Sequence, residues 1–94
     1  MALAQPPEDL GPGRAVFMSK CKVCHGSTGE GNPAVARALK TTQPVLYAET
    51  VQGKSDADLK KIIAMGSGKM KPVAGMGDSD FGSVIAFVRT LKQP

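Results

Sequence analysis

The chain has 94 residues, a formal net charge of +4 and two cysteines. A chain of this length makes one domain with a marginal apolar core, so we expect extra stabilisation from a metal, a cofactor or a partner chain. Two cysteines exclude the disulfide framework of a small secreted scaffold, and the lack of an apolar run of about 18 residues predicts a soluble chain without a membrane span.

The first residues predict a flexible lead-in over residues 1–7, followed by a single domain over residues 8–94. Ala2-Leu3-Ala4 fits the end of a secretory signal and an ordinary unstructured N-terminus equally well. Apolar residues at helical spacing then predict a helix over residues 8–22. Residues 26–33, GSTGEGNP, predict a loop because they hold three glycines and a proline.

The middle of the chain predicts two further helices. A short helix is expected over residues 34–40, and residues 41–53 read as mostly irregular. Ser55 then precedes a helix that ends near residue 65, since Asp58 three positions later resembles a capping box and the apolar residues form one stripe.

The last third of the chain predicts a long loop and a closing helix. Residues 66–77, GSGKMKPVAGMG, contain four glycines and a proline and predict an extended loop. Residues 78–92 predict a helix with acidic residues at its start and basic residues near its end. No segment shows strand-like alternation, so the predicted fold class is all-α with three to five helices.

One motif carries chemistry. Cys21-Lys22-Val23-Cys24-His25 has the form C-x-x-C-H, which is a signal for attachment of c-type haem. Two thiols three residues apart lie near one face of a helical turn, where they can add to the two vinyl groups of a porphyrin. The following histidine can then present an imidazole nitrogen to the iron, so we predict one haem c per chain.

The motif has three other interpretations. A thioredoxin-like C-x-x-C requires a βαβ context, and the chain offers no strand pattern. A structural zinc site requires four ligands, whereas the sequence holds only three cysteine or histidine residues. Two unrelated cysteines beside a chance histidine are the third reading. The chain's one histidine lies at the position that haem requires, which favours the haem prediction.

The iron of such a haem needs a second axial ligand besides His25. The chain has no second histidine, so methionine is the expected ligand, because a thioether is soft and neutral and favours ferrous iron. Met70 is preferred and Met76 is its rival, since both lie in the glycine-rich loop. Met18 and Met65 are better explained as core residues. An open iron or a lysine ligand also stays open.

These residues resemble the small monohaem bacterial cytochromes c of class I. The resemblance covers about residues 8–92 and depends on CKVCHG, KSDADLKKIIAMGSGKMKP and SDFGSVIAFVRTL. It implies a compact cytochrome c-like fold around one haem, with the first and last helices crossing at Gly13, Phe17 and Phe87. It also maps the axial methionine onto Met70, although Lys71 separates Met70 from Pro72 and keeps Met76 in consideration.

Two further site residues follow only from this resemblance. A family proline after the attachment motif offers its carbonyl to the proximal imidazole N–H, and Pro33 is the candidate here. The tryptophan that larger members place near a haem propionate is absent, so Tyr47 or Lys54 is expected to serve instead.

The resemblance implies an electron carrier that moves single electrons between redox proteins after export, for example to a periplasm. Basic residues flanking the haem-binding segments predict partners with acidic docking surfaces, unless they are only a solvated surface: Lys20, Lys22, Lys69 and Lys71. Nucleic acid is not an expected partner, because no aromatic-basic interleaving is present. The alternatives are a haem subunit of a larger oxidoreductase, and a sensor or peroxidase with an open iron. We expect a monomer, with a domain-swapped dimer left open.

Overall fold

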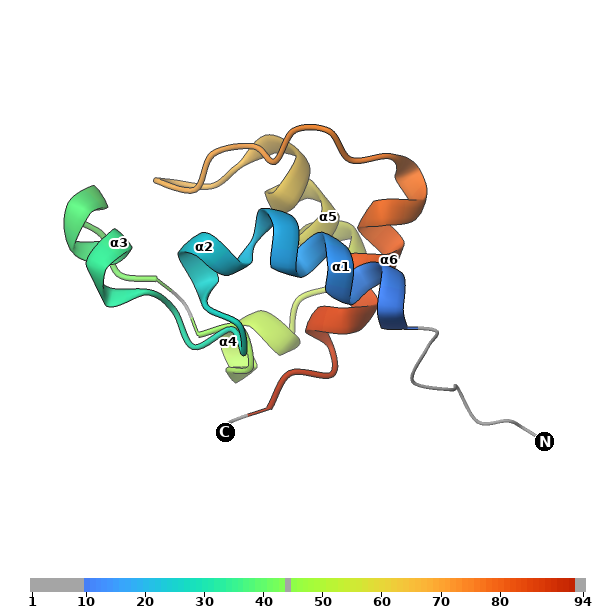
Figure 1. The fold of residues 1–94 in the computed structure, drawn as a ribbon, viewed down its shortest axis with the longest axis horizontal. Helices are drawn as coiled ribbons and strands as arrows, with labels where there is room; N and C mark the ends of the chain where they lie inside the picture. The colour runs from blue at the N-terminus through green and yellow to red at the C-terminus, as the bar shows by residue number, and fades with distance from the viewer. Residues whose placement is uncertain (1–9, 44, 93–94) are drawn as a thin grey trace.

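The computed structural model describes residues 10–43 and 45–92, which form six helical segments and no β-strand. Figure 1 shows their arrangement: α1 (Gly11–Lys20), α2 (Lys22–His25), α3 (Pro33–Leu39), α4 (Glu49–Gln52), α5 (Asp56–Met65) and α6 (Asp78–Val88). The all-α class is confirmed. Four of the segments have seven residues or more, and α2 and α4 are single turns of four residues. The predicted lead-in over residues 1–7 lies outside the described residues.

The crossing of α1 and α6 is the most extensive helix contact in the described chain. Gly13 permits it, because a Cβ atom at this position would collide with the carbonyl oxygen of Ser83. One turn later the rings of Phe17 and Phe87 lie 5.2 Å apart between centroids and tilted by 51°, a favourable aromatic geometry. The predicted crossing of the first and last helices is therefore confirmed.

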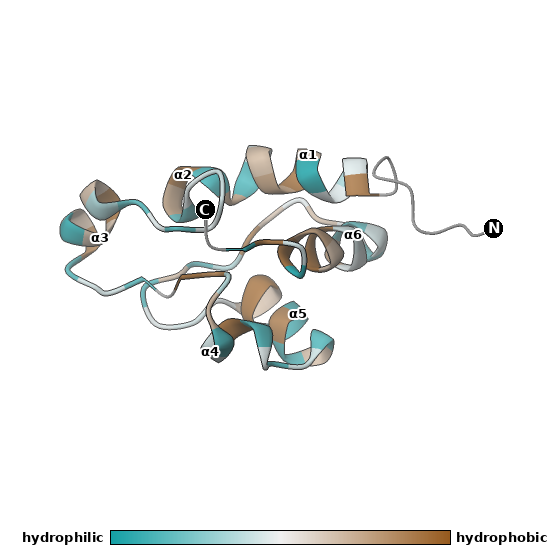
Figure 2. Ribbon diagram, turned by 90° about the horizontal axis from the view of Figure 1, so that it is seen from below, coloured by the Kyte–Doolittle hydropathy of each residue, from teal (hydrophilic) through white to brown (hydrophobic). Residues whose placement is uncertain are grey.

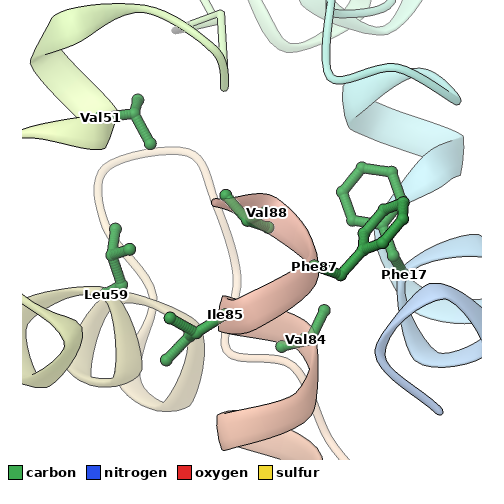
Figure 3. Close-up of a cluster of buried hydrophobic side chains, with 7 residues drawn as sticks. All are labelled: Phe17, Val51, Leu59, Val84, Ile85, Phe87 and Val88. Carbon is green, nitrogen blue, oxygen red and sulfur yellow. The ribbon is translucent and has the colours of Figure 1, made fainter. Parts of the chain in front are cut away.

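The buried core is small and centred on α6. Figure 2 shows α6 between α1 and α5, with hydrophobic residues along it. Seven buried side chains form the core, and four of them belong to α6 (Figure 3): Phe17, Val51, Leu59, Val84, Ile85, Phe87 and Val88. α3 lies at the opposite end of the molecule from the α1–α6 crossing (Figure 1) and contributes no residue to this core.

The first helix is shorter than predicted and is interrupted at Cys21. α1 ends at Lys20, and Cys21 has φ −115° before α2 begins at Lys22. Hydrogen bonding continues across the interruption, since Cys21 N donates to Phe17 O at 2.8 Å. The attachment motif is therefore a separate turn set at the end of α1.

The other differences lie at α4 and at the end of α6. Residues 49–52 form the single turn α4 within a segment predicted to be mostly irregular. α6 ends at Val88, before the predicted end at residue 92, because Thr90 and Leu91 donate to carbonyls three positions back and so form a tighter turn. The predicted capping of α5 is observed, with Ser55 Oγ accepting from Asp58 N at 3.1 Å.

Candidate haem-attachment site

Both cysteines of the motif are free thiols and half-buried. They lie on one turn, in which Cys24 N and His25 N donate to Cys21 O at 3.2 and 2.9 Å. Burial raises the pKa of the Cys21 thiol, and the neighbouring Cys24 adds to this shift while Lys20 opposes it. The Cys21 thiol is therefore protonated at neutral pH.

His25 has a half-buried imidazole that is neutral at pH 7. Burial lowers the pKa of His25 below its usual value of 6.5, because a charged ring loses its hydration. Its Nδ1 atom is buried and has no hydrogen-bond partner among the described residues. A buried polar atom without a partner is costly, and a neutral imidazole is the form that binds a metal. The ring thus suits an axial ligand.

Pro33 does not make the hydrogen bond that the resemblance implies. It is exposed and is the first residue of α3, where carbonyls point along the helix axis toward later residues. Because His25 Nδ1 has no partner within the described chain, the predicted bond to the Pro33 carbonyl is absent from this structure. The intervening loop instead bonds to the backbone of His25, since Gly31 N donates to His25 O at 2.7 Å.

The four described methionines have different surroundings. Met18 and Met76 pack against the buried core. This position was expected for Met18, and it makes Met76 the less favourable candidate for the iron ligand. Met65 is 67% exposed at the end of α5, where a core position was predicted. Met70 is half-buried and lies in a tight turn, with Met70 N donating to Ser67 O at 2.8 Å and Ser67 N to Met70 O at 2.9 Å.

Gly66 fixes the position of this turn. Its φ is +83°, and a Cβ atom here would approach Met70 O to 2.6 Å and Pro72 Cδ to 3.0 Å. Farther along the loop, Val73 N donates to Ile63 O at 2.9 Å and ties the chain back to α5. The loop that carries Met70 is therefore anchored at both sides of the methionine.

Tyr47 and Lys54 are the remaining predicted site residues. Tyr47 is half-buried before α4, and its hydroxyl makes no recorded hydrogen bond within the described chain. Lys54 is exposed, and its carbonyl oxygen accepts from Arg89 Nη2 at 2.6 Å. Among the described residues, no hydrogen bond joins Tyr47 or Lys54 to the attachment turn.

The four lysines predicted to surround the site are all exposed: Lys20, Lys22, Lys69 and Lys71. Lys20 Nζ lies beside Gly75, since a Cβ atom built on that glycine would be 3.3 Å from it. The end of α1 and the loop that carries Met70 therefore meet around a positive charge.

The residues fit a haem c by their chemistry. Cys21 and Cys24 supply two free thiols for thioether bonds, His25 supplies a neutral imidazole, and Met70 supplies a thioether outside the core cluster. Such a group would also complete an apolar core of only seven buried side chains. Two surface hollows of the described chain lie between α5 and α6 and beside α3.

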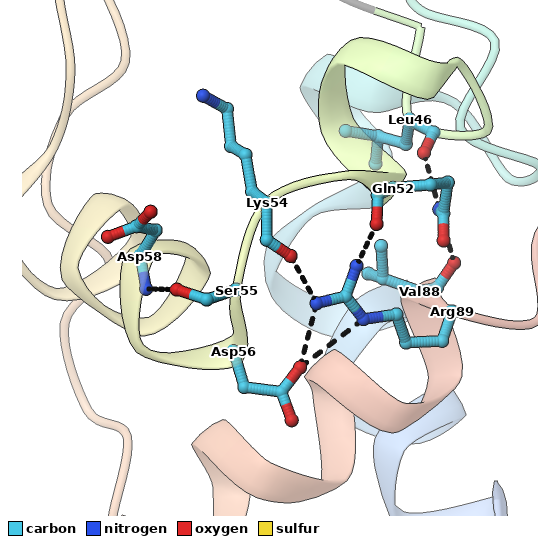
Figure 4. Close-up of polar contacts among 8 residues, drawn as sticks. All are labelled: Leu46, Gln52, Lys54, Ser55, Asp56, Asp58, Val88 and Arg89. Carbon is cyan, nitrogen blue, oxygen red and sulfur yellow. Dashed lines mark hydrogen bonds and ion pairs between the residues drawn. The ribbon is translucent and has the colours of Figure 1, made fainter.

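Two polar residues join distant segments of the chain, and the sequence analysis did not identify them. Gln52 and Arg89 bond to backbone carbonyls from distant segments (Figure 4). Nothing in their sequence context indicates these bonds, because the partners are main-chain atoms that only the folded chain brings near.

Comparison with known proteins supports the same family. A family model described as cytochrome c oxidase, cbb3-type, subunit III matches residues 8–88. A solved structure described as KustC0563 c-type cytochrome superposes with a TM-score of 0.73 at 21% sequence identity, covering 86% of this chain and 98% of that chain, and so supports the fold. Among curated protein sequences, none matches significantly. The family match spans most of the chain. The protein therefore belongs to the family of cytochrome c oxidase, cbb3-type, subunit III, and it is a small class I cytochrome c with covalently bound haem c.

Proposed function

We propose that this protein is a soluble electron carrier that exchanges single electrons between redox proteins, with haem c attached to Cys21 and Cys24 and ligated by His25 and Met70. The observation that carries the proposal is the attachment turn itself, where two free thiols adjoin a half-buried imidazole whose lowered pKa keeps it neutral. Haem c supplies an iron that alternates between two oxidation states.

Each residue has a distinct part in this proposal. The two cysteines keep the cofactor from dissociating, because thioether bonds do not exchange. His25 and Met70 would both bind the iron and leave no place on it for a substrate, which favours electron exchange over ligand chemistry. As a soft neutral ligand, Met70 also favours the reduced state and raises the reduction potential. Anchoring of its loop at Gly66 and Val73 limits rearrangement when the charge changes.

Positive charge around the site would attract acidic partners. Lys20, Lys22, Lys69 and Lys71 are exposed and flank the two segments that hold the predicted ligands. We propose that they steer acidic docking surfaces into short-lived complexes whose formation weakens with salt. Within the described residues, no helix is long and apolar enough to cross a membrane. An exported, periplasmic location and a monomeric state complete the proposal.

Absorption spectra of ferric and reduced protein test the axial ligands. Ferric wild-type protein should show the weak long-wavelength band of methionine–iron coordination, and Met70→Ala should abolish it. Met76→Ala is the matched control, because Met76 lies in the same loop but packs against the core, and this variant should keep the band. Loss of the band only in Met76→Ala would overturn the assignment of Met70.

A second candidate function is a haem subunit of a larger oxidoreductase, which the cbb3-type oxidase family favours. A partner that stays bound through purification from the native membrane fraction would support this role, and a protein that purifies alone would support the free carrier. Ready binding of carbon monoxide by reduced wild-type protein would contradict both roles, because it requires an open or easily displaced sixth ligand.

A further inference from the structure

The loop that follows the attachment turn, residues 26–32, lacks regular secondary structure and depends on contacts for its shape. It bonds directly to the proposed axial ligand, since Gly31 N donates to His25 O at 2.7 Å. Inside the loop, Gly29 N donates to Gly26 O at 3.2 Å, and φ is positive at all three of these glycines. Whatever holds this loop therefore also holds the backbone of His25.

Leu46 holds the loop at Gly29. Leu46 N donates to Gly29 O at 2.8 Å across 17 positions of sequence. Gly29 is buried, and a Cβ atom on it would approach Leu46 Cβ to 2.8 Å and Leu91 Cδ1 to 2.9 Å. The loop backbone thus fits into a space with no room for a side chain, and a shift of Leu46 would be transmitted to Gly29.

Gln52 in turn holds Leu46. Its side-chain amide donates from Nε2 to Leu46 O at 2.7 Å and to Val88 O at 3.1 Å (Figure 4). Val88 is the last residue of α6, where carbonyl oxygens lack partners within the helix. Both amide hydrogens of Gln52 are therefore used, and they join the segment before α4 to the end of the main core helix.

We propose that Gln52 is a positioning residue for His25, acting through Leu46, Gly29 and the loop after the attachment turn. The proposal depends on the proposed function, in which His25 is an axial ligand. An amide that can donate two hydrogen bonds is required at this position, because both of its partners are carbonyl oxygens. Loss of these bonds releases Leu46 from α6 and loosens the loop that orients the imidazole, which changes the environment of the metal.

Asp56 offers a matched control at the same end of α6. The Arg89 guanidinium pairs with Asp56 Oδ1 at 2.8 Å and donates separately to Gln52 O at 2.7 Å and to Lys54 O at 2.6 Å (Figure 4). Loss of the Asp56 carboxylate removes the ion pair and leaves the bonds of Gln52 in place. Asp56→Ala should therefore lower stability slightly without acting on the His25 loop.

The experiment compares haem-loaded wild-type protein with Gln52→Ala, Gln52→Glu and Asp56→Ala. Exchange of the Leu46 amide proton, relative to global unfolding, should rise about tenfold or more in both Gln52 variants and stay near wild type in Asp56→Ala. The paramagnetically shifted His25 ring resonances of the ferric protein and the midpoint potential should change in the same two variants only. Gln52→Glu keeps the side-chain size but not the donor, so it separates hydrogen bonding from packing.

The proposal is overturned if Gln52→Glu matches wild type in Leu46 exchange and His25 resonances, or if Asp56→Ala changes both as much as the Gln52 variants do. If Gln52→Ala yields no haem-loaded protein, Gln52→Glu alone decides between these outcomes. The readouts also separate two kinds of failure. Spectra that exclude His25 as a ligand overturn the proposed function, whereas Leu46 exchange tests the link to Gln52 independently.

Discussion

Two groups of the attachment turn are shifted toward their neutral forms. Burial raises the pKa of the Cys21 thiol, so the thiol stays protonated, and it lowers the pKa of the His25 imidazole, so the ring stays deprotonated. A protonated thiol is a weak nucleophile toward disulfides. The turn therefore slows oxidation of Cys21 and keeps the imidazole of His25 in the form that binds a metal.

Glu30, in the loop after the turn, has a pKa that is shifted in favour of its charged form. Hydrogen bonds from the side chain and backbone of Thr28 to its carboxylate hold the pKa of Glu30 below its usual value of 4.5. A depressed carboxyl pKa in the folded state stabilises the fold above the unfolded pKa, and this contribution is lost as the pH falls through the folded value.

Thr28→Ala should raise the pKa of Glu30 toward 4.5 and move acid unfolding of the loop to a higher pH, because the hydroxyl donor is lost. The change can be followed by NMR titration of the Glu30 carboxyl carbon in haem-loaded protein. Thr50→Ala, an exposed threonine in α4, is the control and should leave the Glu30 titration unchanged. An unaltered Glu30 titration in Thr28→Ala would contradict the hydrogen-bond explanation.

Among the elements, the loop between α5 and α6 carries the proposed ligand Met70. It starts with a turn fixed by Gly66 and returns to α5 at Val73. The glycines here are not equivalent. Gly66 faces backbone atoms at close range, whereas Gly68 has φ +55° and open space where a Cβ would lie.

Gly66→Ala should displace Met70, since the new Cβ would collide with Met70 O at a position that also has positive φ. We expect the methionine–iron band of ferric protein to be lost or strongly weakened. Gly68→Ala is the matched control, because it introduces only the cost of a left-handed residue, about 1 kcal/mol, and should retain the band. Equal spectra for the two variants would show that the turn does not set the methionine's position.

The α1–α6 crossing gives a second prediction at this scale. Gly13→Ala should lower the free energy of unfolding by about 3 kcal/mol, because the Cβ would meet main-chain atoms of Ser83 that cannot move without shifting α6. Gly11→Ala on the same helix meets nothing within 4 Å and should change stability by less than about 1 kcal/mol. Denaturant unfolding of both haem-loaded variants distinguishes them, and similar midpoints would contradict a tight crossing.

Local sequence signals predicted the helices whose boundaries are set by nearby residues. The helix after Ser55 begins at Asp56 and ends at Met65 as its cap and glycine indicate. The end of α6 and the turn α4 were missed. α6 ends in a tighter turn where Thr90 and Leu91 donate to carbonyls three positions back, and the bonds from Gln52 and Arg89 to distant main-chain carbonyls have no signal in the sequence. The attachment motif was visible because its chemistry needs adjacent residues, whereas the ordering of its loop by Leu46 needs segments far apart in the chain.

For the whole molecule, charge is the property most open to test. The net charge of +4 gives a long-range attraction for anions, but only some lysines lie near the predicted ligands. Lys20 adjoins the loop after Met70, whereas Lys92 lies beyond the end of α6. Net charge and local charge can therefore be separated by variants that each remove one positive charge.

Lys20→Gln should slow oxidation of the reduced protein by ferricyanide about twofold at low salt, and the difference should shrink as salt rises. Lys92→Gln lowers the net charge equally and should have a smaller effect, because Lys92 lies outside the two segments that carry the proposed ligands. Stopped-flow kinetics over a range of ionic strength measure both. Equal slowing by the two variants would mean that net charge alone guides the encounter.

The position of α6 in the chain also governs when folding can begin. Four of the seven core residues lie between Val84 and Val88, and their partner Phe17 lies in the first helix. During synthesis, the emerging chain lacks four of these seven core residues until its last segment appears. Cys21 and Cys24 consequently belong to a chain without most of its core throughout that interval.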